Sequence, residues 1–233
     1  MIRSRRAFLG LMAVGLAAPA QAQVFGLPIP DDDFYDDPAA PPGAEDWYVD
    51  AIPDRPFDVP VVDLSRLHPS LRRQQVWYDG PGRPGTVVVD TGARFLYLVG
   101  RDGSALRYGI GVGRQGFSWS GTAQIRRKAR WPSWRPPATM RRRRPDLPAF
   151  MEGGLDNPLG ARALYLYQGG RDTLYRIHGT NEPWSIGQAV SSGCIRLLNQ
   201  DIYDLYERVP VGTTVMVLAG SRRRGPVELD WES

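Results

Sequence analysis

The chain carries the stretch YRIHGTNEPWSIGQAVSSGCIRL at residues 175–197, which contains its only cysteine, Cys194. A lone cysteine is often just a buried small side chain, but here Gly193 precedes it and allows the backbone to turn tightly. His178 ends a strand-like run 16 residues before Cys194. An imidazole near a thiol takes its proton and stabilises the thiolate, which is the nucleophilic form. The two residues together predict a nucleophilic cysteine with a histidine base.

The N-terminus has the pattern of an export signal. Arginines precede a short apolar run from Ala7 to Ala18, and the small-residue pattern AQA at 20–22 follows it. The apolar run is shorter than the roughly 20 residues that a membrane-spanning helix needs. The string SRRAFL at 4–9 is typical of a twin-arginine signal. We therefore predict a signal peptide over 1–22, export by the twin-arginine pathway, and a periplasmic protein with no stable membrane span after signal removal.

Export limits what the single thiol can do. The compartment is oxidising, and a chain with one cysteine cannot close an internal disulfide. The chain also lacks the C-x-x-C pair that is typical of thiol-redox proteins. The thiol of Cys194 is therefore expected either to be buried or to take part in a reaction.

Composition gives no reason to expect nucleic acid, a metal ion or a cofactor as a partner. The formal charge of the whole chain is +4, and the loss of three arginines with the signal leaves +4 − 3 = +1. Such a charge gives no reason to expect binding to nucleic acid. The chain has no paired cysteines and no histidine pair on a helix, so no metal site and no cofactor are predicted. The aspartates near residues 31–37 lack the spacing and central glycine of a calcium loop.

The mature chain divides into three regions. Residues 23–69 are rich in proline and aspartate, which predicts a linker or arm. Residues 70–220 form a mainly β domain with one or two short helices, and residues 221–233 form a charged tail. The convincing helix is NQDIYDLYERV at 199–209, with Asn199 as its expected N-cap. The expected strands lie in six β-rich runs at 86–90, 94–99, 105–112, 163–168, 173–179 and 213–220.

The stretch at 175–197 resembles the active-site signature of the L,D-transpeptidase catalytic domain, the YkuD-type fold. The resemblance extends through GVGRQGFSWSGTAQI, DNPLGARALYL and VPVGTTVMVL. It implies a β-sandwich-like catalytic domain that needs no metal or cofactor. It also implies site roles: Cys194 is the nucleophile, His178 is the general base, and Gly193 with Cys194 forms part of the oxyanion site. By the same resemblance Ser191 and Ser192 line that turn, Ser192 standing where many members have histidine, and Arg196 orders the loop or meets a substrate carboxylate.

The resemblance further implies a substrate, the peptide stems of peptidoglycan, cut before a terminal D-alanine. Cys194 is expected to form a thioester with the stem tetrapeptide, and an amine of a neighbouring stem to resolve it as a cross-link. A wall-linked protein is another candidate partner. A hydrolytic relative, acting as an L,D-carboxypeptidase or releasing wall-linked protein, uses the same cysteine and histidine, so the sequence leaves this alternative open. The sequence also leaves open the orienting partner of His178 and the role of the four arginines at 141–144.

Overall fold

The computed structural model describes residues 40–113, 119–191 and 194–219. The predicted signal at 1–22, the predicted tail at 221–233, and Ser192 with Gly193 lie outside the described residues. The first part of the predicted arm also lies outside them. What the sequence predicts for these segments stays a prediction.

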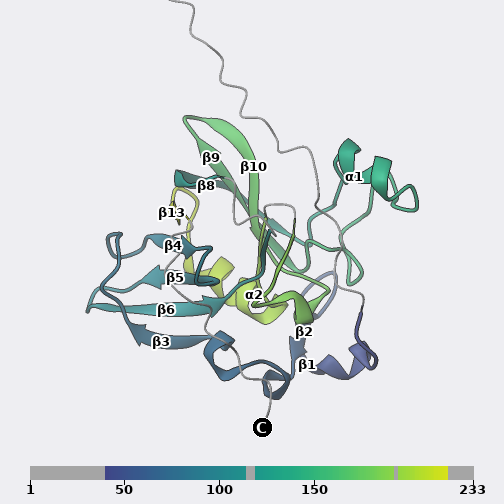
Figure 1. Cartoon of the computed structure of the whole chain (residues 1–233), viewed down its shortest axis with the longest axis horizontal. Coiled ribbons are helices and arrows are strands. Elements are labelled where there is room, and N and C mark those ends of the chain that lie inside the picture. Colours follow the sequence, from purple (N-terminus) through teal and green to yellow (C-terminus); the bar gives the residue numbers. More distant parts are fainter. Residues whose placement is uncertain (1–39, 114–118, 192–193, 220–233) are drawn as a thin grey trace, which may run out of the picture. The chain divides into compact units, whose positions relative to one another are not determined.

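The main element of the fold is a nine-stranded mixed sheet (Figure 1). Its strand order is β12-β10-β9-β8-β13-β4-β5-β6-β3. β12 runs parallel to β10, and β13 runs parallel to β4, while the other neighbours are antiparallel. The prediction of a mainly β fold is confirmed. The strands of this sheet are β3 (Gln74–Trp77), β4 (Val87–Asp90), β5 (Phe95–Val99), β6 (Ser104–Gly109), β8 (Gly121–Arg130), β9 (Arg162–Gln168), β10 (Arg171–His178), β12 (Ile195–Arg196) and β13 (Thr214–Leu218).

The remaining elements are short. Two further pairs of strands join β1 (Tyr48–Ile52) to β2 (Val59–Val62) and β7 (Val112–Gly113) to β11 (Ala189–Ser191). The α-helices in the described residues are α1 (Ala138–Arg143) and α2 (Asn199–Arg208), and neither has the length and apolar character needed to cross a membrane. Single 3₁₀ turns are η1 (Ala44–Trp47), η2 (Leu64–Arg66), η3 (Pro69–Leu71) and η4 (Pro183–Ser185). All six predicted β-rich runs contain strands, whereas β3, β8 and β12 of the same sheet were not predicted.

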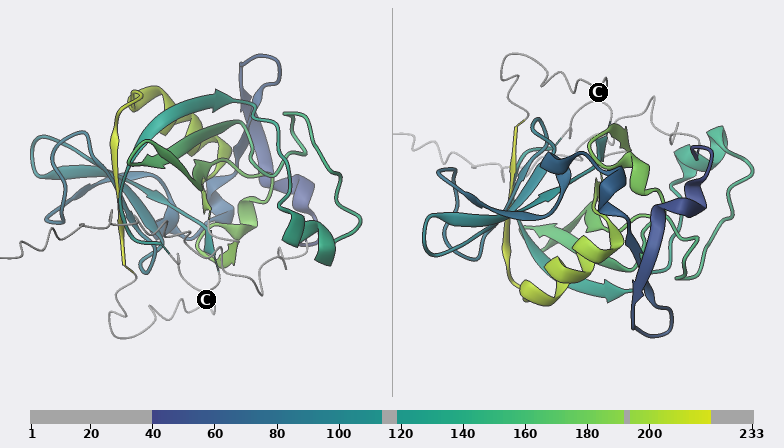
Figure 2. Two further views of the ribbon diagram at one scale, coloured as in Figure 1. Left: turned by 90° about the horizontal axis from the view of Figure 1, so that it is seen from above. Right: turned by 90° about the horizontal axis from the view of Figure 1, so that it is seen from below.

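The core lies on one face of the central strands. Successive side chains of a strand point to opposite faces, and Leu164 and Leu166 of β9 are fully buried together with Ile177 of β10 and Ile195 of β12. Figure 2 shows α2 lying along this part of the sheet, where its Ile202 side chain joins the same core. Side chains that alternate with these core residues on β10 and β12 therefore face away from the core.

The two ends of α2 are held in different ways, and the first differs from the sequence prediction. Leu198 occupies the N-cap position and makes no side-chain cap hydrogen bond, so the prediction of Asn199 as N-cap is wrong. At the other end, Lys128 of β8 donates to the backbone carbonyls of Tyr206 and Val209 at 2.6 and 2.8 Å. The last carbonyls of a helix have no partner within it. The only lysine of the chain therefore caps α2 from the neighbouring strand.

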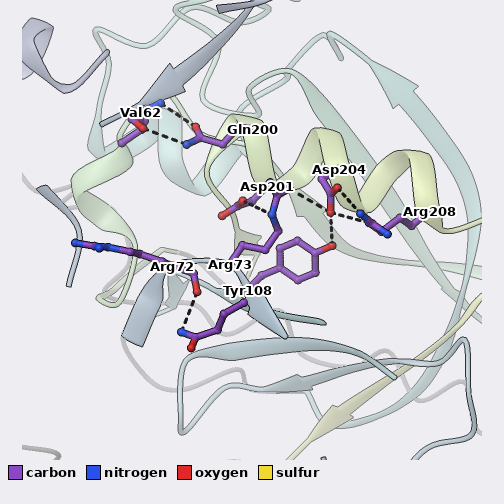
Figure 3. A network of polar contacts seen from close by, with 9 residues as sticks. Val62, Arg72, Arg73, Tyr108, Gln200, Asp201, Asp204 and Arg208 are labelled. Carbon is purple, nitrogen blue, oxygen red and sulfur yellow. Dashed lines mark hydrogen bonds and ion pairs between the residues drawn. The ribbon is translucent and has the colours of Figure 1, made fainter. Parts of the chain in front are cut away.

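Polar contacts tie α2 to elements far away in the sequence (Figure 3). Gln200 accepts from the backbone N–H of Val62 at 2.9 Å and donates to its carbonyl at 3.2 Å. Asp204 accepts from the hydroxyl of Tyr108 at 2.7 Å. Asp201 lies 3.7 Å from Arg73 and is buried, and this burial raises its pKa to about 7 despite the nearby guanidinium. The helix thereby links β2, β6 and the segment before β3.

The described part of the predicted arm contains the β1–β2 hairpin. Asp54, in its turn, accepts hydrogen bonds from Arg162 at 2.8 Å and from the indole N–H of Trp131 at 3.0 Å, and it pairs with Arg130. Burial raises the pKa of Asp54, but the Arg162 hydrogen bond and the other donors outweigh it and hold the pKa at about 2. These contacts fasten the hairpin to the last residue of β8 and the first residue of β9. The boundary expected at residue 70 stays a prediction.

Candidate active site

The register of β10 and β12 brings the predicted nucleophile and base together. Ile177 pairs with Ile195 and His178 pairs with Arg196, both in parallel. Extending this register by one residue places Cys194 beside Arg176 and diagonal to His178. The strand spacing and rise per residue put the Cα atoms of such a diagonal pair about 8 Å apart. Because Ile177 and Ile195 face the core, the side chains of Cys194 and His178 share the opposite face.

The imidazole of His178 is fixed by a backbone group. The ring is 3% exposed, and its Nδ1 lies 2.6 Å from the carbonyl oxygen of Gly179. A carbonyl only accepts, so Nδ1 carries the proton and donates it in this hydrogen bond. Nε2 is then the unprotonated nitrogen, which is the atom that a general base uses. The orienting partner of His178, which the sequence left open, is this carbonyl.

Asn199 holds the backbone segment that orients the histidine. Its Oδ1 accepts from the N–H of Ala161 at 3.0 Å, and its Nδ2 donates to the carbonyl of Thr180 at 2.8 Å. The side chain is only 4% exposed and packs so closely on Gly179 that a Cβ there would lie 2.2 Å from Oδ1. The sequence predicts Asn199 only as a helix cap, whereas its side chain holds this backbone segment. Gly179, directly after the histidine, was the available sign that another group approaches the backbone closely.

Burial keeps the imidazole neutral. Burial, together with the positive charges of Arg196 and Arg176, lowers the pKa of His178 to about 3, although the hydrogen bond to Gly179 acts in the opposite direction. At neutral pH the ring is therefore a free base. If it takes a proton, the resulting imidazolium is a strong acid and returns that proton readily.

The thiol is also neutral at rest. Burial raises the pKa of Cys194, and this outweighs the charge of Arg176, the backbone N–H of Arg176 and the charge of Arg196, which all lower it. The sequence predicts an imidazole that stabilises the thiolate and so lowers the pKa of the thiol, but the neutral ring in the structure supplies no charge for this. The arrangement suits removal of the thiol proton by Nε2 during attack on a substrate carbonyl.

Arg196 joins β12 to the loop between His178 and Cys194. Its backbone exchanges two hydrogen bonds of 2.9 Å with Gly111. Its guanidinium donates to Glu182 at 2.8 Å, and its side chain is only 5% exposed. Glu182 follows His178 by four residues, so this ion pair holds the 179–188 segment against β12. Of the two roles that the family resemblance gives Arg196, the contact with Glu182 supports the ordering of the loop.

The other predicted site residues lie around the same turn. Ser191 ends β11, where its backbone pairs with Gly113 of β7. Ser192 and Gly193 fall outside the described residues, so their predicted roles are untested. Among the described residues, no three histidine, cysteine, aspartate or glutamate side chains are grouped as a metal site would require.

A long excursion of the chain begins and ends beside His178. Ala129 of β8 pairs with Ala163 of β9, and Ala163 pairs with His178. Between β8 and β9 the chain leaves the sheet for residues 131–161 and includes α1, which Figure 1 shows beyond the ends of these strands. The amide of Asn181 donates to the carbonyl of Asp156 at 3.0 Å. The excursion therefore contacts the segment that follows the histidine.

The family model and two curated relatives that match this chain all belong to the L,D-transpeptidases. The sequence model of the L,D-transpeptidase catalytic domain family, YkuD, matches residues 84–217. The probable L,D-transpeptidase ErfK/SrfK of Escherichia coli K12 is 41% identical over 141 residues, covering 57% of this chain and 43% of that protein. The probable L,D-transpeptidase YbiS of the same strain is 40% identical over 142 residues, covering 58% and 44%. The matched segment spans less than half of each relative.

One solved structure matches over nearly its whole length. It is described as a probable carnitine operon oxidoreductase from Brucella melitensis, and it is 48% identical, covering 67% of this chain and 99% of its own. Its TM-score is 0.45.

Proposed function

Because the chain belongs to the family of L,D-transpeptidase catalytic domains, we propose that it is a peptidoglycan L,D-transpeptidase acting through Cys194 and His178. The observation that carries this proposal is the placement of both side chains on one face of β10 and β12, with the imidazole oriented by the Gly179 carbonyl. The proposed substrate is a stem tetrapeptide with a terminal D-alanine. The proposed product is a cross-link between two stems.

The first half of the reaction forms a thioester. Nε2 of His178 removes the proton of Cys194 while the sulfur attacks the carbonyl before the D-alanine. The resulting oxyanion would be met by the backbone N–H groups of Gly193 and Cys194. The imidazolium then gives its proton to the amine of the leaving D-alanine, and the low pKa of His178 favours this step. The C–N bond breaks, and the stem remains on the sulfur.

The second half transfers the stem to an acceptor. An amine of a neighbouring stem attacks the thioester, and Nε2 takes the proton that this amine loses. The C–S bond breaks and the thiolate recovers the proton from the imidazolium. Arg196 would keep the loop beside Cys194 in place through Glu182, with Ser191 and Ser192 lining the turn. If water or a wall-linked protein replaces the amine, the same residues give the hydrolytic activity or a protein attachment.

We also propose that the protein acts in the periplasm after export by the twin-arginine pathway. The string SRRAFL at 4–9 and the short apolar run behind it support this location.

The experiment that tests the function supplies the purified protein with a tetrapeptide stem, with and without a second stem as acceptor. Release of D-alanine together with a cross-linked dimer supports the transpeptidase. Release of D-alanine without any dimer indicates the hydrolytic activity instead. The matched control is Cys194→Ala, which removes only a small side chain and is expected to fold without activity. D-alanine release by this variant would refute the assignment of the nucleophile.

A further inference from the structure

A row of side chains crosses the sheet and ends at Cys194. Arg127 of β8 pairs with Tyr165 of β9, and Tyr165 pairs with Arg176 of β10. The β10–β12 register then places Cys194 beside Arg176. Leu164 and Leu166 on either side of Tyr165 point into the core, so the row lies on the face that carries the thiol. The strands β8, β9 and β10 lie side by side in Figure 1.

The two arginines are held on one aromatic ring. The guanidinium carbon of Arg127 lies 4.4 Å from the centroid of the Tyr165 ring, and that of Arg176 lies 4.4 Å from the same centroid. Both distances are within the range of a cation–π contact. Tyr165 is only 8% exposed although it faces away from the core. The contacts fix the direction of two side chains that would otherwise be mobile, so less entropy is lost when either one binds a ligand.

Only one of the two charges is neutralised. Arg176 donates to both carboxylate oxygens of Asp172, at 2.7 and 2.9 Å. No carboxylate pairs with Arg127 among the residues that the structure describes, and its side chain is exposed. The end of the row that is remote from Cys194 therefore presents an uncompensated guanidinium. A guanidinium in a fixed position is a good partner for a carboxylate, which it can bind with two parallel hydrogen bonds.

The position of Arg127 matches the length of the proposed substrate. Three strand spacings separate Arg127 from Cys194 along the row, a Cα–Cα distance of about 14 Å. The guanidinium of Arg127 lies on the ring of Tyr165, which is two strand spacings, about 10 Å, from Cys194. The three stem residues before the scissile bond also span about 10 Å when extended. A stem with its scissile bond at Cys194 would therefore reach this guanidinium with its opposite end if it lay along the row.

From this row, we propose that Arg127, held on the ring of Tyr165, binds a carboxylate of an acidic stem peptide at the end remote from the scissile bond. Arg127 is then a specificity-determining residue for anionic peptides. The inference rests on the proposed function, because the peptide is the substrate of Cys194.

The test uses two tetrapeptide stems that differ only in their side carboxylates, which are free in one and converted to amides in the other. In Arg127→Gln, the KM for the free acid should rise about tenfold, the size expected of one charge-assisted hydrogen bond. The KM for the amide should stay within about twofold of the wild type, as should kcat for both peptides. Arg127→Lys, which keeps the charge but loses the planar fork, should restore part of the discrimination. The matched control is Arg126→Gln, an exposed neighbour on β8 outside the strand register, which should change neither KM.

A second measurement separates this inference from the proposed function. Binding of the same two peptides is measured by calorimetry in the Cys194→Ala background, where no turnover is needed. A loss of affinity in Arg127→Gln that is confined to the acidic peptide supports the subsite, whatever the reaction proves to be. Equal effects on both peptides, or no effect on either in a folded variant, overturn the subsite. Absence of D-alanine release by the wild type would instead refute the proposed function.

Discussion

Gly179→Ala is expected to disable the histidine without touching either reactive side chain. A Cβ at this position would lie 2.2 Å from Oδ1 of Asn199 and 3.1 Å from the nitrogen of Ala161. Non-bonded heavy atoms prefer separations of about 3.5 Å, so the backbone or the amide must move by about 1 Å. The Gly179 carbonyl that orients His178 belongs to the same residue and would move with it.

The expected loss follows from that displacement. A misplacement of about 1 Å in a catalytic group lowers the rate by about 100-fold, and we expect this change in kcat for D-alanine release with KM nearly unchanged. The stability cost of the added methyl group should be about 1–3 kcal/mol, which the melting temperature will report. The rate of Cys194 alkylation near neutral pH should fall as well, because Nε2 no longer meets the thiol in its productive orientation.

The control for this prediction is Gly154→Ala. A Cβ at Gly154 meets only the ring of Phe57, at 3.9 and 4.0 Å, which is an ordinary contact. Neither Gly154 nor Gly179 has a positive φ, so alanine introduces no backbone strain at either position. Gly154→Ala should keep wild-type activity. A folded Gly179→Ala protein with a kcat within about twofold of the wild type would refute the role given to the Gly179 carbonyl.

The remaining predictions concern His178 and the carboxylates of Asp201 and Asp54. His178→Ala should slow alkylation of Cys194 near neutral pH and change its pH profile, because the thiol loses its proton acceptor. Asp201→Asn should be more stable than the wild type above pH 7, by up to about 4 kcal/mol. Burial raises the pKa of Asp201 from 3.8 to about 7, so wild-type stability falls as the pH rises between these values. Asp54→Asn should lose about 3 kcal/mol at neutral pH, because Arg162 remains buried without its partner.

The outcomes that would contradict these predictions are distinct. An identical alkylation rate and pH profile in His178→Ala would mean that the imidazole does not act on the thiol. Parallel stability curves for Asp201→Asn and the wild type between pH 4 and 8 would show that Asp201 is not protonated in the native state. The pKa of Asp54 is lowered from 3.8 to about 2, so its contribution is present above pH 3.8 and is lost as the pH falls to about 2. A difference between Asp54→Asn and the wild type that persisted below that pH would contradict its role.

The pairing of His178 with Cys194 could be proposed from the sequence because its signals are local. A histidine at the end of a β-rich run and a lone cysteine after a glycine can each be read from a few residues. The β-rich runs likewise predicted a mainly β fold. What brings Cys194 beside β10 is the parallel pairing of β12, a two-residue strand. No pattern in two residues predicts a strand partner, and the family resemblance supplied this link instead.

The missed strand β8 shows where pattern reading fails. Its sequence, GTAQIRRKAR, has few apolar residues and ends in a run of charges. In the structure those charges pack on aromatic rings from distant elements: Arg127 on Tyr165 and Lys128 on Tyr206. The long aliphatic stems of such side chains cover apolar surface while the charged ends find partners. Because these side chains are charged, their packing leaves no alternation of apolar residues from which a strand could be predicted.

The β1–β2 hairpin was missed for a similar reason. Its proline- and aspartate-rich composition favoured a linker, because few of its residues can enter a core. The hairpin is fastened by Asp54 to Arg162, which lies 108 residues away in the sequence. Asn199 likewise reads as a helix cap locally, whereas its partners Ala161 and Thr180 come from other parts of the chain.

The measurement that tests the central claim most directly is the intact mass of the protein during turnover of a tetrapeptide stem. The account predicts release of D-alanine and a transient adduct with the mass of the acyl stem on Cys194, lost in Cys194→Ala. Both steps of the exchange pass through this thioester, whether an amine or water resolves it. A folded protein with a reduced thiol that released no D-alanine and formed no adduct with several stem peptides would contradict the account.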